Sequence, residues 1–181
     1  MRRLLFVAVV ALAGLPVEAN NRHVTLANYV GEDGTEWLRD ATLISAVLAQ
    51  NQVSADYSLE DITQLDADWR AGTLAGGSDL INAVLYNDAA GILRAQVERS
   101  GGAITEIILM DARGLNVAVS HVTTDYWQGD EAKFLETYGI GPDAIHLGQI
   151  GLDDSTGHYQ RQISVTLVDP ATGVAIGAVT I

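Results

Sequence analysis

Apolar positions between residues 36 and 100 recur every three or four residues, which predicts helices. Thr35 precedes the first apolar stripe and has the side chain of an N-cap residue. Ser58 and Asp61 have the spacing of a capping box, so a second helix is expected to begin there. Ser78 is expected to cap a third, long helix that continues to Gly101-Gly102, because glycine is common just past a helix end.

From Ile104 onward the apolar positions alternate, which predicts strands. The expected strands are residues 104–110, 115–120, 145–152, 159–168 and 174–181, with turns at Asp111–Gly114 and Asp169–Gly173. Helices followed by strands in hairpin order indicate an α+β fold. We expect a five-stranded antiparallel sheet with the N-terminal helices (residues 36–100) packed on one face.

The fourth expected strand separates apolar and polar side chains between its two faces. The apolar side chains are Ile163, Val165 and Leu167, and the polar ones are Gln160, Gln162, Ser164 and Thr166. The apolar face is expected to pack against helices. The polar face is expected either to contact water or to line a small wet cavity, and the sequence leaves both open.

The first nineteen residues differ from the rest of the chain. Arg2 and Arg3 precede an apolar run from Leu4 to Leu15, and small residues close it at Val17 and Ala19. This order is typical of a secretory signal peptide cleaved after Ala19. The run is shorter than the roughly 20 residues of a membrane span. We therefore expect a periplasmic protein with one domain at residues 20–181; the alternative is an uncleaved N-terminal anchor.

Composition excludes several kinds of function. The chain has 10 basic and 23 acidic residues, a net charge of −13, which disfavours binding to nucleic acid or anionic lipid. The absence of cysteine excludes disulfides, thiolate catalysis and thiolate zinc sites. The four histidines lack the spacing of a metal site, and the sequence contains no nucleophile-elbow, metalloprotease or phosphate-loop motif. We expect no enzymatic activity, metal or cofactor.

The segment TTDYWQGDEAKFLET, residues 123–137, is the main candidate for a binding site. Tyr126 and Trp127 offer flat apolar walls with an O–H and an N–H donor, and Trp127 could also face a cation. Asp125 or Asp130 could pair with the ammonium group of a ligand. Alternatively, the two rings fill the space above the sheet and Asp130 caps a helix at residues 131–138. Capping is favoured for Asp130, and ligand binding for the rings.

Further candidates lie on the third and fourth strands. Asp153 and Asp154 could bind an amine, although they lack the spaced acids of a calcium loop and could equally form an acidic turn. Gln160 and Gln162 share one face, so they would hydrogen-bond to a ligand if that face lines a pocket, or else form an exposed edge. His146, at the start of the third strand, could border the same pocket.

Three segments carry a resemblance to a known family: ITEIILMDARGLNVAVS, DYWQGDEAKFLETY and IGLDDSTGHYQRQISVTLVDPATGVAIGAVTI, which begin at residues 104, 125 and 150. Together they resemble the Cache superfamily of extracytoplasmic sensor domains, which are PAS-like in fold. The resemblance implies an Asp-x-x-Gly turn between the first two strands, and a loop that closes over a small ligand held against the sheet.

The resemblance also implies a signalling partner. Such domains typically continue into a transmembrane helix and a signalling module, whereas this sequence stops at Ile181. We therefore expect the chain to capture an amino acid, amine or carboxylate. The signal would pass to a membrane receptor or histidine kinase, or to a second copy met through the N-terminal helix. The alternative is an interaction module whose pocket is filled by Tyr126 and Trp127.

Overall fold

The computed structural model describes residues 35–153 and 158–181. The predicted signal peptide and Asp154 lie outside these residues. The helices of the first half are η1 (Glu36–Arg39), α3 (Ala41–Ser54), α4 (Leu59–Ala75), α5 (Asp79–Leu85) and α6 (Asp88–Arg99). No helix within the described residues is long and apolar enough to span a membrane.

The helix starts follow their capping residues. The predicted capping box of α4 is confirmed: Ser58 Oγ accepts from Asp61 N at 3.2 Å, and Asp61 Oδ2 accepts from Ser58 N at 2.8 Å. Hydrogen bonds from the side chain and backbone of Ser58 lower the pKa of Asp61. At the first helix the structure differs from the prediction. A 3₁₀ turn follows Thr35, and α3 is capped by Asp40, whose Oδ1 accepts from Thr42 N at 2.7 Å.

The prediction of one long helix from Ser78 to Gly101 is wrong, because the chain breaks between α5 and α6. Asn87 has an extended backbone and its Oδ1 accepts from Ala90 N at 2.8 Å, so it caps α6. Its Nδ2 donates to Ala83 O and to Val117 O, each at 2.9 Å. The Asn87 side chain thus bonds to the last turn of α5, caps α6, and links the segment between the two helices to β2.

The strands are β1 (Ile108–Met110), β2 (Asn116–Val119), β3 (Ile145–Asp153), β4 (His158–Val168) and β5 (Ala175–Thr180). They form one sheet in the order β2-β1-β5-β4-β3, and neighbouring strands are antiparallel. The predicted α+β, PAS-like fold with a five-stranded antiparallel sheet is therefore confirmed. The last strand in sequence lies at the centre of the sheet.

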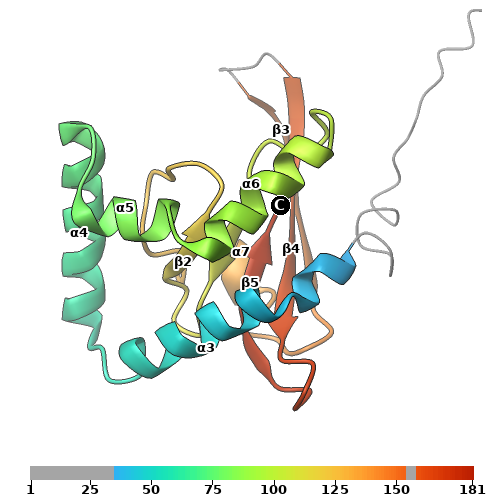
Figure 1. Cartoon of the computed structure of the whole chain (residues 1–181), viewed down its shortest axis with the longest axis horizontal. Coiled ribbons are helices and arrows are strands. Elements are labelled where there is room, and N and C mark those ends of the chain that lie inside the picture. Colours follow the sequence, from blue (N-terminus) through green and yellow to red (C-terminus); the bar gives the residue numbers. More distant parts are fainter. Residues whose placement is uncertain (1–34, 154–157) are drawn as a thin grey trace, which may run out of the picture. The chain divides into compact units, whose positions relative to one another are not determined.

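Helices lie on both sides of the sheet (Figure 1). The helices α3 and α6 cross in front of the strands, and α7 (Ala132–Leu135) lies behind them (Figure 1). A core cluster joins α4 and α5 to β1, β2 and the loop after β2; it includes Trp69, Val84, Met110, Leu115 and Phe134. The side chains that face this core fix the positions of the helices around the sheet.

The prediction for β4 is confirmed on its apolar face, where Ile163, Val165 and Leu167 are buried. The polar face is divided. Ser164 and Thr166 are buried, since Ser164 Oγ lies 2.9 Å from Thr180 Oγ1 and Thr166 Oγ1 donates to Gly141 O at 2.6 Å. Gln162, by contrast, is exposed.

Candidate ligand-binding site

The loop after β2 is fastened to α4 by charged groups. Asp66 Oδ1 accepts from Tyr126 N at 2.9 Å and from Trp127 N at 3.1 Å. Arg70 contacts Asp66 at 2.8 Å and Asp125 at 3.0 Å. The carboxylate of Asp125, predicted to pair with a ligand, is therefore already paired with a cation of the protein.

The two aromatic residues differ in their surroundings. Tyr126 is 6% exposed and stacks on Trp69 of α4, with ring centroids 5.5 Å apart. Trp69 in turn donates from Nε1 to Thr123 O at 2.8 Å. Trp127 is half-buried and donates from Nε1 to Arg113 O at 2.9 Å, so its N–H already has a partner. Both rings thus help to hold the loop in place.

Two glycines allow the loop to approach the turn between β1 and β2. A Cβ at Gly114 would lie 2.4 Å from Gly129 Cα, and Gly114 has a φ of +76°. The backbone of Gln128 donates to Gly114 O at 2.8 Å. The Asp-x-x-Gly turn and the aromatic loop therefore form one packed unit.

The prediction that Asp130 caps the following helix is wrong. The helix α7 begins at Ala132 with Glu131 at the N-cap position, and Glu131 makes no side-chain capping bond. Asp130 is exposed. Glu131 instead pairs with the buried Lys133 at 3.2 Å, and Lys133 Nζ also contacts Gln128 Oε1 at 2.8 Å. The charge of Lys133 draws the acidic side chain away from the helix terminus.

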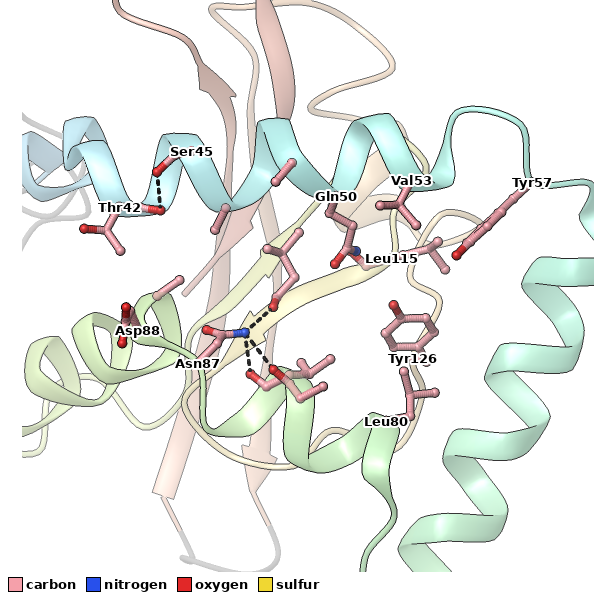
Figure 2. Close-up of a pocket in the computed structure, with 16 residues that line it drawn as sticks. Thr42, Ser45, Gln50, Val53, Tyr57, Leu80, Asn87, Asp88, Leu115 and Tyr126 are labelled. Carbon is pink, nitrogen blue, oxygen red and sulfur yellow. Dashed lines mark hydrogen bonds between the residues drawn. The ribbon is translucent and has the colours of Figure 1, made fainter.

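A cavity of about 570 Å³ lies between α3, α5 and β2 (Figure 2). Its walls are mostly apolar, with polar residues toward both ends. Gln50, Tyr57 and Tyr126 lie toward one end, and Thr42, Ser45, Asn87 and Asp88 lie toward the other (Figure 2). The apolar lining includes Ala46, Ala49, Val53, Leu80, Ala83, Val84, Leu115 and Val117. This volume is within the range of small-molecule sites, which are mainly apolar with a few placed polar groups.

Tyr126 brings a hydroxyl group to this cavity. Within residues 35–153 and 158–181 no hydrogen bond involves the Tyr126 hydroxyl, although the residue is more than nine-tenths buried. Burial raises the pKa of Tyr126, and the nearby Asp111 and Tyr57 raise it further. The Tyr126 hydroxyl is therefore a neutral group available to a ligand.

A second cavity, of about 550 Å³, lies beside the β3–β4 hairpin. Gln160 and Gln162 line it together with Glu106, His121 and Gln149. Gln160 Oε1 accepts from Thr105 Oγ1 at 3.1 Å. Burial raises the pKa of Glu106, while the charges of Lys133 and His121 act in the opposite direction.

The predicted site residues thus do not meet in one place. Tyr126 lines the first cavity, and Gln160 and Gln162 line the second. His146 lines neither, and its Nδ1 lies 2.7 Å from Glu136 Oε2. The backbone of Asp153 pairs with His158 at the end of the hairpin.

Six polar residues that line the first cavity are not candidates in the sequence analysis. They are Gln50 and Tyr57, near Tyr126, and Thr42, Ser45, Asn87 and Asp88, toward the other end of the cavity (Figure 2). The glutamine lies on α3, about 65 positions before the strand that it contacts. In the sequence Gln50 has no spacing or motif that marks it as a binding residue.

No protein-family model and no curated protein matches the sequence. The fold is nevertheless similar to several solved structures. The Vibrio cholerae histidine kinase DctB sensor domain has 13% identity and a TM-score of 0.48, over 87% of this chain and 48% of that chain. The chain therefore spans about half the length of that domain.

Two chemoreceptor domains are also similar. The ligand-binding domain of Campylobacter jejuni Tlp3, in complex with 4-methylisoleucine, has 13% identity and a TM-score of 0.39, over 79% of this chain and 58% of that one. That of Pseudomonas fluorescens CtaA, in complex with L-isoleucine, has 16% identity and a TM-score of 0.34, over 86% and 58%. The chain has an α+β fold with a five-stranded antiparallel sheet, and similarity at this level assigns it neither a family nor a ligand.

Proposed function

We propose that this chain is a periplasmic sensor module that captures a small organic solute in the cavity of Tyr126 and signals through a separate partner. One observation carries the proposal: a largely apolar cavity of about 570 Å³ is lined by the phenol of Tyr126, whose hydroxyl has no hydrogen-bond partner in the described residues. That hydroxyl can donate a hydrogen bond to a ligand and accept one from it, while the apolar walls enclose the ligand's body.

The position of Tyr126 gives a route for the signal. Its ring stacks on Trp69, and its backbone N–H is held by Asp66, so both contacts lead to α4. A ligand that contacts the Tyr126 hydroxyl would therefore bias the loop and α4 together. The partner, a membrane receptor or histidine kinase, or a second copy of the chain, would detect that change.

A thermal-shift screen with amino acids, amines, carboxylates and purines tests the proposal. A ligand that binds the folded state stabilises it by mass action, by about 2.7 kcal/mol at a concentration of 100 Kd. Tyr126→Phe should weaken binding about fivefold, because it removes one neutral hydrogen bond. Tyr86→Phe is the matched control, since Tyr86 is 70% exposed and does not line the cavity. Equal binding by both variants would contradict the assigned cavity.

A second function is an interaction module without a ligand. The contacts that favour it are the stack of Tyr126 on Trp69 and the bond from the Trp127 indole to Arg113, because they show the rings engaged in packing. In that case the melting temperature would not respond to any compound, and Trp127→Ala would simply lower it.

A further inference from the structure

We infer that the cavity of Tyr126 accepts neutral or cationic head groups on an apolar body and rejects carboxylates. This inference rests on the proposed function and names the chemical class of its ligand. It follows from a buried acid beside the cavity and from the hydrogen-bonding groups that remain for a ligand.

Asp111 is the buried acid. It is fully buried, and its two oxygens accept four hydrogen bonds, all from neutral groups. Oδ1 accepts from Arg113 N at 2.8 Å and Leu115 N at 2.9 Å; Oδ2 accepts from Ser54 Oγ at 2.8 Å and Gln50 Nε2 at 3.3 Å. Within the described part of the chain Asp111 forms no ion pair.

Arg113, two residues after Asp111 in the sequence, directs its guanidinium to other acceptors. The guanidinium of Arg113 donates to Tyr57 O at 2.7 Å and to Ala55 O at 3.3 Å. The charge of Asp111 is therefore solvated by dipoles and not cancelled by a neighbouring cation. Its influence reaches the cavity, since it contributes to the raised pKa of Tyr126.

The lining adds no positive charge. Of the described residues that line the cavity none is lysine or arginine, and Asp88 is the one charged side chain among them. A ligand carboxylate placed beside Tyr126 would lose its hydration and meet a negative potential. An ammonium or a neutral donor would meet a favourable one.

The available hydrogen-bonding groups point to the same class. Gln50 Nε2 is committed to Asp111 Oδ2 and to the carbonyls of Leu115 and Asn116, at 3.3–3.5 Å. Its oxygen forms no hydrogen bond within residues 35–153 and 158–181, and Figure 2 shows the side chain reaching the cavity near Tyr126. Gln50 thus offers an acceptor, which suits a ligand that donates N–H or O–H groups.

Phenethylamine, 2-phenylethanol and phenylacetate test the inference, because they share one apolar body and differ in the charge of the head group. Isothermal titration of the full chain at neutral pH should give amine and alcohol affinities about tenfold or more above that of the carboxylate. Gln50→Met should weaken the amine and alcohol severalfold. Gln52→Met, an exposed position on the same helix, should change neither.

The other outcomes separate the two proposals. Phenylacetate binding as tightly as the amine would overturn the inference about ligand class and leave the cavity as a binding site. No binding of any of the three at millimolar concentration would overturn the cavity itself, and with it the proposed function. Asp111→Asn adds a second readout that depends on charge: the preference for amine over carboxylate should shrink if this variant folds. Gln50→Met provides the test if it does not.

Discussion

Single side chains in this protein form hydrogen bonds with several backbone groups at once. Asp66 accepts from two consecutive N–H groups of the aromatic loop and pairs with Arg70, which also holds Asp125. A carboxylate is suited to this role because its oxygens can accept several hydrogen bonds. The loop therefore depends on a residue of α4 that lies about 60 positions earlier.

Replacing Asp66 by alanine should destabilise the protein strongly. The N–H groups of Tyr126 and Trp127 would lose their acceptor in a buried setting, at a cost of about 3 kcal/mol in the free energy of unfolding. Urea denaturation measures the loss. Asp68→Ala is the control, since Asp68 is exposed and accepts one bond from Gln64 within α4; its effect should be about 0.5 kcal/mol or less. Similar losses in the two variants would refute the role of Asp66.

Among the elements, β5 is the central strand and has a neighbouring strand on each side. It pairs with β1 on one side and with β4 on the other. At Gly177 the approach to β1 leaves no room for a side chain, because a Cβ there would lie 2.1 Å from Met110 O. The central strand thus requires glycine at this position for a steric reason.

Gly177→Ala is expected to lower stability by about 1–3 kcal/mol or more, because the backbone of β1 would have to move. The midpoint of chemical denaturation measures this effect. Gly151→Ala tests the same substitution on the edge strand β3, where a Cβ would meet nothing within 4 Å, and should be nearly neutral. A neutral Gly177→Ala would show that the two strands are farther apart than described.

At the level of elements the sequence predicted much of the fold. The change from helical to alternating period located all five strands, and the Ser58–Asp61 pair located the start of α4. The break at Asn87 could not be predicted, because apolar spacing continues through it and Asn87 donates its stabilising bond to Val117 O, 30 positions later. Likewise, Asp130 has a good capping side chain, but the N-cap position of α7 falls on Glu131. The Glu131 carboxylate pairs with Lys133 and forms no capping bond.

The binding site was harder to predict than the fold. Tyr126 was identified because aromatic rings beside acids stand out in a sequence. Gln50 and Tyr57 were not, since they reach Tyr126 only when α3 packs over β2. Chain segments far apart in sequence build the cavity, so its lining depends on tertiary packing that periodicity does not encode.

At the scale of the whole molecule, acidic residues outnumber basic ones, and the net charge is −13. Like charges repel one another more strongly in the folded chain than in the expanded one. The few basic side chains are used in local pairs, such as Arg70 with Asp66 and Lys133 with Glu131.

Raising the NaCl concentration from about 10 mM to about 200 mM should therefore raise the melting temperature by a few degrees, because it shortens the screening length from roughly 30 Å to below 10 Å. Differential scanning calorimetry measures the change. A fall in melting temperature would mean instead that the local ion pairs contribute more than the repulsion.

The central position of residues 175–180 has a consequence for how the molecule assembles. The β1–β2 and β3–β4 hairpins can each form from neighbouring residues, but within the described sheet the strand that pairs with both is β5, whose Thr180 pairs with Ile108. Residues 175–180 must therefore have left the ribosome before the two hairpins can be joined into one sheet. Contacts so distant along the chain also slow folding. Such a delay would suit a polypeptide that crosses a membrane before it adopts its final shape.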